Sequence, residues 1–315
     1  MSEMNERGIV LPMVLLAISL LIVIILGFDS EARRELKEAA AFRDGMSASA
    51  LNWAGLQTAR ATLLEDTIRD LKAGQAYDSV TDSWGLLSGP FSLGEGVVSV
   101  SISDERSKLN VNDLALPREL KQRAAIILRF KRLFTALSID SQLVEALVDW
   151  VDQDDVQERN GAESPYYESL KPAYRTPNEA MQTLDELRLV RGMTDEYFQR
   201  LRRYITVYPI VSDGWININT AEAIVIQSLH EKITPAMVME IIQARPFRTL
   251  KDLDKLTSVE PIVKELRLLN AYDVWSDYFA IRISAEMGGV TKRGHAVVQR
   301  SRANGASHVV TFEIE

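Results

Sequence analysis

Cysteine is absent from this 315-residue sequence, and histidine occurs only three times. Without cysteine there can be no disulfide scaffold, thiolate zinc site, iron–sulfur cluster or cysteine nucleophile. The histidines, His230, His295 and His308, are widely spaced and form no HExxH pattern, which argues against a histidine-based metalloenzyme. No GxSxG motif is present either, so the sequence offers no serine nucleophile of the common hydrolase type.

An excess of positive charge is also missing. Acidic residues outnumber basic residues by 44 to 36, which gives a net charge of −8 and argues against a dedicated nucleic-acid-binding protein. With 46% hydrophobic and 25% charged residues, the composition is that of an ordinary globular chain rather than a disordered one. At about 100–200 residues per domain, the length indicates one to three domains.

One long uncharged run departs from these averages. Ile9–Phe28 contains no charged residue, and as a helix it would span about 30 Å, the thickness of a hydrocarbon core. A secretory signal peptide would have a shorter run and an A-x-A-like cleavage site, which is missing here. The next segment, Ser30–Lys72, continues as a helix former as far as Gly74. We therefore predict a membrane span that extends into a long helix, whose apolar face packs on a sheet through Ala50, Leu51, Ala54, Ala61 and Leu64.

The segment before the span is a polar leader, MSEMNERG, that ends in Gly8. This arrangement resembles the prepilin leader, which a prepilin peptidase removes at the cytoplasmic face of the membrane. The resemblance implies cleavage between Gly8 and Ile9 and N-methylation of Ile9. Basic residues do not fix the orientation of the span, because Arg7 is the only one in the leader whereas Arg33 and Arg34 follow the span.

Met13 would be the fifth residue of the processed chain. Pilins and most pseudopilins carry a glutamate there, whose carboxylate meets the terminal amine of a neighbouring subunit. An unpaired carboxylate inside a bilayer is costly, so a subunit with no neighbour above it has no use for one. Met13 is then the position of the missing pilin glutamate. The alternative is that Met13 is simply one more residue that faces lipid.

Strand-like segments occur in two places that are far apart in the sequence. Val97–Ile102 alternates, and Lys108–Asn112 follows it after a turn-like segment; three further segments, Tyr278–Ser284, Ala296–Arg300 and His308–Ile314, lie near the C-terminus. Two strands alone are marginally stable. We therefore expect the early and late strands to form one sheet against the long helix, and the helical region between them to be an insertion.

An acidic segment, Asp149–Glu163, holds six carboxylates against a single arginine. Hard oxygen ligands at close spacing, followed by an Asn-Gly turn, suit calcium better than zinc. The ligand order is not that of an EF-hand. We predict a structural calcium site, with one or two ions held by Asp152, Asp154, Asp155 and Glu163. The alternative is a solvated acidic loop that holds no metal.

Two other segments of the helical region, Asn178–Tyr204 and Asn217–Leu256, look alike and resemble helix-hairpin-helix units. Such units usually bind DNA phosphates through a glycine-rich hairpin with flanking lysines. Gly192 is the only hairpin glycine here, and each segment has five acidic and five basic residues. Neutral units lack the basic surface that phosphate binding requires, which favours a structural or protein-contact role.

These features converge on one family. The apolar helix after Gly8, together with SDERSKLNVNDL, DWVDQDDVQERNGAESPYY, WININTAEA and YFAIRISAEM, resembles the type II secretion minor pseudopilin K (GspK) family over essentially the whole chain. The resemblance implies an α+β pseudopilin fold, in which a long N-terminal transmembrane helix packs on an antiparallel sheet and a large all-α domain with helix-hairpin-helix or SAM-like units is inserted. The implied organisation is a leader (1–8), a span (9–28), a pseudopilin domain in two parts (29–114 and 276–315) and the inserted domain (115–275).

The resemblance also implies a function without catalysis. The chain is expected at the tip of the type II secretion pseudopilus, where it helps to start pseudopilus assembly and export across the outer membrane. Expected partners are the minor pseudopilins I and J, pseudopilin H, the major pseudopilin G, the prepilin peptidase and the inner-membrane assembly platform, but no nucleic acid. The expected location is the inner membrane, with a single span and the C-terminal region in the periplasm. The alternatives are a membrane-anchored helix-hairpin-helix DNA-binding protein of a competence or pilus system, and a periplasmic hydrolase.

Overall fold

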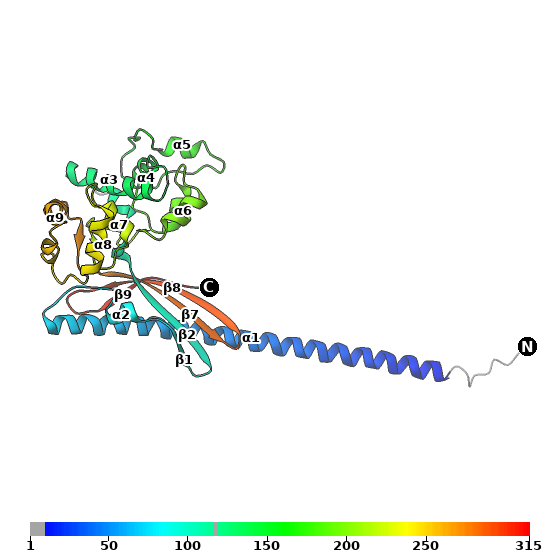
Figure 1. Cartoon of the computed structure of the whole chain (residues 1–315). Coiled ribbons are helices and arrows are strands. Elements are labelled where there is room, and N and C mark those ends of the chain that lie inside the picture. The colour runs from blue at the N-terminus through cyan, green and yellow to red at the C-terminus, as the bar shows by residue number, and fades with distance from the viewer. Residues whose placement is uncertain (1–9, 116–118) are drawn as a thin grey trace, which may run out of the picture.

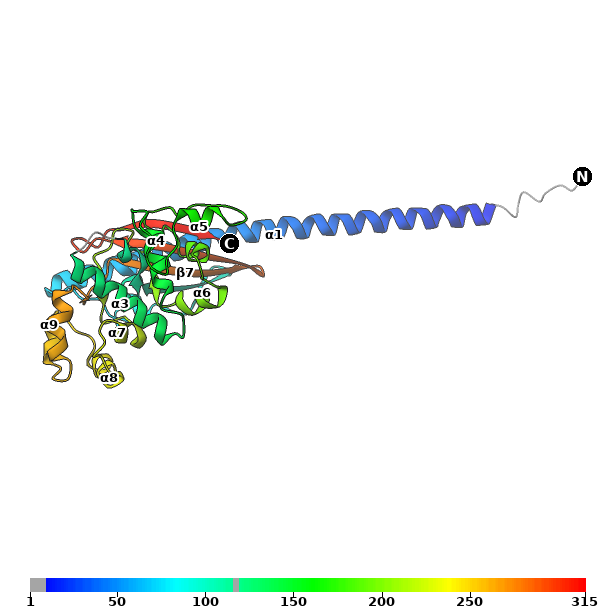
Figure 2. The same ribbon diagram turned by 90° about the horizontal axis from the view of Figure 1, so that it is seen from above.

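The computed structural model describes residues 10–115 and 119–315, so the expected cleavage site at Gly8 and Ile9 lies outside the described residues. Helix α1 (Val10–Ala73) is 64 residues long, or about 96 Å at 1.5 Å per residue. Residues 10–39 are all exposed, and Figures 1 and 2 show this half of the helix projecting from the rest of the molecule. Within the described residues, α1 is the one helix that is long and apolar enough to cross a membrane.

Helix α1 stops at Gly74, as its sequence predicts. Gly74 has a φ of +64°, a conformation that glycine adopts without a steric penalty. The amides of Gly74 and Gln75 donate hydrogen bonds to the carbonyls of Leu71 (3.2 Å) and Asp70 (2.9 Å). This pair of bonds is the Schellman motif, which satisfies carbonyls at the end of a helix.

The second half of α1 packs on the sheet through a face that the apolar pattern alone does not identify. Its buried residues recur every three or four positions and include Ala48, Leu51, Asn52, Gly55, Leu56, Ala59 and Leu63. The predicted face was partly wrong, because Ala50, Ala61 and Leu64 are exposed. Asn52 is the reason: it is fully buried, and its Nδ2 donates to the carbonyls of Ala48 (3.1 Å) and Lys292 (3.2 Å). A polar residue therefore lies at the centre of the packed face.

Gly55 sets how closely α1 approaches the sheet. A Cβ atom at this position would lie 2.9 Å from Cγ2 of Ile283 and 3.2 Å from Cγ2 of Val100. Gly45 lies ten residues earlier in the same helix and has no such restriction, because the nearest atom to a Cβ there would be Cγ1 of Val290 at 4.0 Å. Close packing of helix on sheet thus depends on one specific glycine.

The sheet has five antiparallel strands in the order β1-β2-β7-β8-β9. The strands are β1 (Pro90–Leu93), β2 (Gly96–Asp104), β7 (Tyr278–Met287), β8 (Val290–Arg300) and β9 (Ser307–Ile314). Strand β2 pairs with β7 along its length, so that Val97 lies opposite Glu286 and Ile102 lies opposite Ile281. The expectation that early and late segments share one sheet is confirmed.

One early strand was predicted in the wrong place. Lys108–Asn112 does not join the sheet; only Leu109–Asn110 (β3) is extended, and it pairs in parallel with Ile205–Thr206 (β4) in the helical region. The sheet instead gains β1, which the sequence analysis did not find. The physical reason lies in the asparagines: Oδ1 of Asn110 accepts a hydrogen bond from the amide of Asn112 (2.9 Å), and such local bonds compete with a strand ladder.

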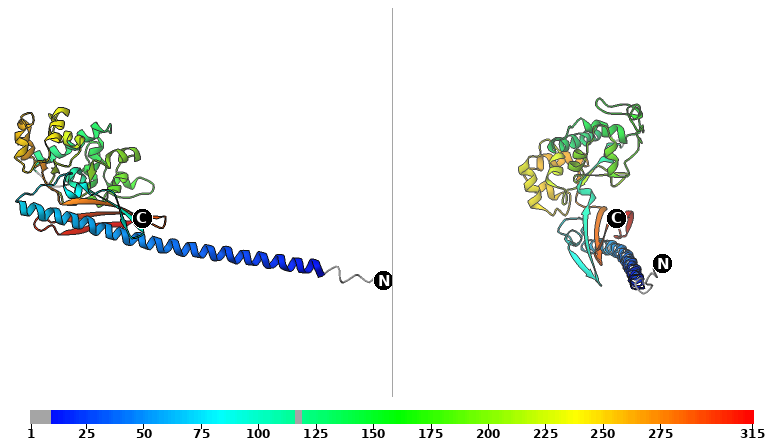
Figure 3. Two further views of the ribbon diagram at one scale, coloured as in Figure 1. Left: turned by 60° about the horizontal axis from the view of Figure 1, so that its bottom comes forward. Right: turned by 90° about the vertical axis from the view of Figure 1, so that its right-hand side faces the viewer.

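The region between β2 and β7 is mainly helical and has its own hydrophobic core, separate from the core between α1 and the sheet. Figures 1 and 3 show it on the far side of the sheet from α1, at the end of the helix away from the N-terminus. It is not purely helical, because it contains two short parallel ladders, β3-β4 and β5-β6. A short helix, α2 (Ser83–Leu86), precedes the sheet and lies outside this region. Besides β3 and β4, the region contains η2 (Glu105–Ser107), η3 (Val111–Leu114), α3 (Leu120–Ala136), α4 (Leu143–Val151), α5 (Ser164–Glu168), η4 (Leu184–Leu189), α6 (Asp195–Leu201), β5 (Ile216–Asn217), α7 (Ala223–Ser228), α8 (Pro235–Ala244), η5 (Asp252–Lys255), α9 (Glu260–Leu268) and β6 (Tyr272–Asp273).

Arg106 joins the helical region to the sheet. Its side chain is 4% exposed, and its Nε lies 2.8 Å from Oδ1 of Asp277, the residue before β7. The guanidinium carbon lies 4.0 Å from the ring centroid of Trp215, within the range of a cation–π contact. This paired and stacked charge holds the end of the helical region, just before β7, next to its start, just after β2.

Candidate functional site

Two parts of the molecule bear on function. One is the projecting half of α1, and the other is the acidic segment Asp149–Glu163 of the helical region, here called the acidic loop. Met13 lies in the apolar part of α1 and is 66% exposed. The first acidic residue after it in the helix is Asp29, which pairs with Arg33 at 2.8 Å. The segment that would lie in the bilayer therefore carries no charge among its described residues, in keeping with the uncharged run in the sequence.

Two carboxylates of helix α4 accept hydrogen bonds from residues of the acidic loop. Oδ1 of Asp149, which is fully buried, accepts a hydrogen bond from the amide of Glu158 (3.0 Å). One turn earlier, Oε2 of Glu145 accepts hydrogen bonds from the amide (3.0 Å) and Nδ2 (2.8 Å) of Asn160. Gly161 must be glycine, because a Cβ atom there would lie 1.9 Å from Oδ2 of Asp149. Asp149 therefore shapes the loop and has its carboxylate already engaged.

Two of the four predicted ligands are buried and have unsatisfied oxygens. Asp152, directly after α4, is 7% exposed; its Oδ2 lies 3.2 Å from Nη2 of Arg123, but its buried Oδ1 has no hydrogen-bond partner among the described residues. Glu163, directly before α5, is 4% exposed, and neither of its carboxylate oxygens has a partner in the described chain. Buried polar atoms are nearly always paired, so these oxygens need a proton, a water molecule or a cation to satisfy them.

The other two predicted ligands, Asp154 and Asp155, are exposed. Oδ1 of Asp154 accepts a hydrogen bond from the amide of Val156 (2.9 Å), and Oδ1 of Asp155 accepts one from Nδ2 of Asn178 (3.0 Å). The amide oxygen of Asn178 is buried and has no partner in the part of the chain that is described. This oxygen is a further candidate ligand atom. The sequence analysis missed it, because nothing in the local pattern around Asn178 links it to the acidic segment.

The electrostatics of the loop agree with this geometry. Burial, followed by repulsion from Asp149 and the other acidic residues, raises the pKa of Glu163 to about 7. Burial and the nearby charge of Asp154 raise the pKa of Asp152 to about 6, although Arg123 acts in the opposite direction. The charged form of both carboxylates is therefore less favourable than in water, and a bound proton or cation would relieve this.

The donor atoms of the loop fit a hard cation. Carboxylate and amide oxygens are the ligands that Ca²⁺ prefers, whereas zinc prefers nitrogen and sulfur. The loop is not a closed cage, however. Within residues 10–115 and 119–315, three ligand atoms from histidine, aspartate or glutamate side chains come within 4.8 Å of one another only at Asp66, Asp78 and Asp82, in a different part of the molecule.

The two segments that resemble helix-hairpin-helix units each contain two short helices joined by a turn. The first uses η4 and α6 with Gly192 (φ +79°) in the turn; the second uses α7 and α8, with the amide of Lys232 donating to Nδ1 of His230 (3.1 Å). Their equal numbers of acidic and basic residues do not favour DNA binding. The helix-hairpin-helix assignment itself stays a prediction.

Comparison with known proteins gives a consistent result. Two family models, both described as type II secretion system (T2SS), protein K, match residues 107–210 and 216–270. Among curated proteins, the type II secretion system protein K of Aeromonas hydrophila is 28% identical over 95% of this chain and 95% of its own length. The protein of the same name from Klebsiella pneumoniae is 28% identical over 76% of both chains.

A solved structure is also similar. In the crystal structure of the GspK-GspI-GspJ complex from the enterotoxigenic Escherichia coli type 2 secretion system, one chain matches with a TM-score of 0.70 and 20% identity. The match covers 90% of this chain and 99% of that one. At this identity the likeness shows a shared fold.

Proposed function

The chain belongs to the type II secretion system protein K family, and from this we propose that it is the minor pseudopilin at the tip of the pseudopilus. The observation that carries the proposal is the position of the helical region. It widens the molecule at the end of α1 away from the N-terminus (Figure 1). In a filament whose subunits stack with their long helices side by side, a head of this width leaves no room for a subunit above it. Its role is therefore structural rather than catalytic.

Met13 supports the same position in the filament. A subunit at the tip has no neighbour above it to supply an amine, so a glutamate at this position would remain unpaired in the bilayer at a substantial cost. Met13 is 66% exposed on the apolar half of α1, where it would contact lipid without that cost. The wide head and the missing acid thus agree with each other.

The similar solved structure is a GspK-GspI-GspJ complex, and the corresponding I and J pseudopilins are the partners proposed for this chain. Pseudopilin H and the major pseudopilin G would follow below them in the filament. In this proposal the chain is anchored in the inner membrane by its single span, and its sheet and helical region lie in the periplasm; the long apolar half of α1 supports the anchor. There it would help the assembly platform to start a pseudopilus that drives export across the outer membrane.

Two covalent and structural features complete the proposal. Prepilin peptidase would remove residues 1–8 after Gly8, and Ile9 would become the methylated N-terminus. In the acidic loop, Asp152, Asp154, Asp155 and Glu163 would hold calcium, with the amide oxygen of Asn178 as a further donor. The unsatisfied oxygens of the two buried carboxylates support this assignment. The ion would supply positive charge to these oxygens and so order the loop in front of α5.

The test is to co-express the tagged full-length chain with I and J pseudopilins and to purify it in detergent. Both partners should co-purify with it in a constant ratio. Phe42 and Met46 are 71% and 62% exposed on the periplasmic half of α1, so Phe42→Asp with Met46→Asp should disrupt the complex. Glu35→Ala with Lys37→Ala, on the same helix, is the matched control.

The position at the tip needs a second measurement. Gold particles directed at the tag should label pseudopili assembled in cells at one end only. Labelling along the whole filament would show that the chain is an ordinary filament subunit. The same purified protein can be tested in a DNA filter-binding assay, where retention of DNA at physiological salt without I and J would favour the DNA-receptor alternative.

A further inference from the structure

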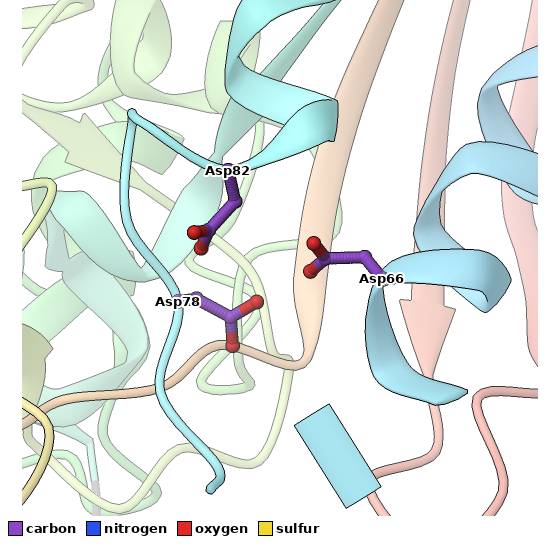
Figure 4. A group of neighbouring side chains, drawn as sticks. All are labelled: Asp66, Asp78 and Asp82. Carbon is purple, nitrogen blue, oxygen red and sulfur yellow. The ribbon is translucent and has the colours of Figure 1, made fainter. Parts of the chain in front are cut away.

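A second group of carboxylates lies where α1 meets the rest of the molecule, away from the acidic loop. Asp66 comes from the last turns of α1, Asp78 from the segment after the helix, and Asp82 from the position just before α2. One ligand oxygen from each lies within 4.8 Å of the others. Figure 4 shows the three carboxylates turned toward one another from these three segments. This group is here called the junction cluster.

The cluster is buried but not fully satisfied. Asp66 and Asp78 are 1% and 2% exposed. Asp78 accepts hydrogen bonds from the amide of Ser276 (2.7 Å) and from Nη2 of Arg300 (2.5 Å). Oδ2 of Asp66, by contrast, accepts no hydrogen bond from any described residue. The nearest cation that contacts it is Nη1 of Arg300 at 3.5 Å, a distance too long for a hydrogen bond of good geometry.

The charges of the cluster do not balance. Three carboxylates share one buried guanidinium, that of Arg300, which is 6% exposed. Arg69 is the next cation, but its Nη1 lies 3.8 Å from Oδ1 of Asp66 and its side chain is 54% exposed. Like charges at such short range repel by about 1 kcal/mol even in water, and by more inside a protein. The cluster must therefore bind protons or a further cation.

The cluster also has space beside it for a further ligand. Beside the cluster lies a small cavity of about 20 Å³, lined by residues that include Asp70, Asp78 and Arg300. A cavity of that size holds about one water molecule. A bound ion could therefore keep a water ligand in addition to the protein oxygens.

We propose that Asp66, Asp78 and Asp82 form a second site for a divalent cation of the hard, oxygen-seeking class, for which calcium is the best fit. Calcium binds oxygens at 2.3–2.6 Å, so two ligands on opposite sides of the ion lie at most about 5 Å apart. The spacing of the cluster lies within that limit. Oδ2 of Asp66, which accepts no hydrogen bond from a described residue, provides a ligand atom.

An ion at this position would strengthen a junction whose segments already make direct contacts, such as the hydrogen bond that Oγ of Ser83 donates to Oδ1 of Asp66 (3.3 Å). It connects the end of α1 to the loop that leads to the sheet. Through the bond between Asp78 and the amide of Ser276, it also reaches the exit of the helical region, and through Arg300 it reaches the end of β8. The junction cluster thus fixes the orientation of the helical region on the sheet, independently of the role proposed for the protein.

The experiment counts calcium on the full-length chain in detergent micelles, by equilibrium dialysis against calcium and elemental analysis. The starting protein carries Asp152→Asn and Glu163→Gln, so that the acidic loop no longer contributes. It should bind one calcium ion per chain. Adding Asp82→Asn should weaken this binding at least tenfold. The control is Glu65→Gln, which removes an exposed charge from α1 next to Asp66 and should leave the binding unchanged.

Asp82→Asn is the variant of choice because the remaining side-chain oxygen can still accept the hydrogen bond from the amide of Ser79 (2.6 Å). Circular dichroism checks that each variant is folded. If the folded loop-deficient protein binds no calcium, the junction site is overturned. It is equally overturned if calcium binding is unaffected by Asp82→Asn and by a second variant, Asp66→Asn.

Discussion

Replacement of Glu163 by glutamine should have opposite effects on stability in the absence and in the presence of calcium. Glu163 is 4% exposed, and neither carboxylate oxygen has a hydrogen-bond partner in the described residues. Burial and the surrounding acidic residues raise its pKa from 4.5 to about 7. The folded protein without calcium therefore holds a proton on Glu163 that the unfolded chain would release at a lower pH.

The direction of the pH effect follows from this shift. A carboxyl group whose pKa is raised by folding leaves stability intact below its unfolded pKa of 4.5, and stability is lost as the pH rises through about 7. At 1.36 kcal/mol per pKa unit, the ionised form at pH 8 costs the calcium-free protein up to about 3 kcal/mol. Glutamine cannot ionise, so the Glu163→Gln variant avoids this cost.

The expected result is a reversal of the order of stability. At pH 8 with chelator, Glu163→Gln should melt several degrees above the wild type, at about 2–4 °C per kcal/mol. With calcium at a hundred times its dissociation constant, the wild type should gain about 2.7 kcal/mol by mass action, and the variant should gain far less. At pH 4.5 with chelator, the difference between the two proteins should be small.

The assay is thermal unfolding of the full-length chain in detergent, followed by circular dichroism. Both proteins should also be measured in an Asp82→Asn background, so that the junction cluster does not contribute to the calcium effect. Glu179→Gln removes an exposed charge from the same region and should leave the melting temperature unchanged. A Glu163→Gln variant that melts below the wild type in chelator at pH 8 would refute the reasoning, because it would mean that the buried carboxylate is already stabilised without a metal.

Other predictions test the leader, the helix packing and the junction with the helical region. With active prepilin peptidase, the wild-type chain should lose eight residues by mass spectrometry, whereas Gly8→Val should keep them because the peptidase requires a small residue; an unprocessed wild type would contradict the leader assignment. Gly55→Ala should destabilise the fold by roughly 1–3 kcal/mol through overpacking, whereas Gly45→Ala should be neutral or stabilising; equal melting temperatures for the two would be evidence against close packing at Gly55. Arg106→Met should cost about 3 kcal/mol in chemical denaturation because it leaves Asp277 without its partner, and a loss below 1 kcal/mol would show that this ion pair is not important.

The sequence predicted best those elements whose side chains repeat with a clear period. The long helix, β2 and the three late strands each have enough residues for the pattern to show, and the structure places them where they were expected. The register between β2 and β7 brings together residues about 180 positions apart, such as Val98 and Ala285. We predicted that pairing because two strands alone are marginally stable and need further strands beside them. No local pattern in the sequence indicated it.

Elements that depend on single polar side chains could not be predicted. The buried face of α1 includes Asn52, and β3 is only two residues long because the side chain of its last residue, Asn110, accepts a hydrogen bond from the amide of Asn112. In the acidic loop, the sequence identified the acidic residues but not which of their oxygens are buried. The burial of Glu163 and the approach of Asn178 both depend on how distant segments pack, and a local sequence pattern contains no information about that packing.

The structure shows a repeat in the helical region, but not in the alignment that the sequence suggested. Asn112 bonds both backbone groups of Met181, accepting from its amide (2.7 Å) and donating to its carbonyl (3.0 Å). Asn219 makes the same pair of bonds with Phe247, each at 2.8 Å. Two residues later, the amides of Thr183 and Thr249 each donate to a carboxylate three residues further on.

The helical region is thus built from two copies of one unit, each beginning with an Asn-x-Asn motif and ending in a strand that pairs in parallel with its start. The two residues joined by this asparagine clasp lie 69 positions apart in the first copy and 28 in the second. The additional residues of the first copy include the whole acidic loop, Asp149–Glu163. A long loop with many like charges gains little from the packing of the unit and needs its own source of order. Calcium would supply that order in the first copy, whereas the shorter second copy does not contain these additional residues.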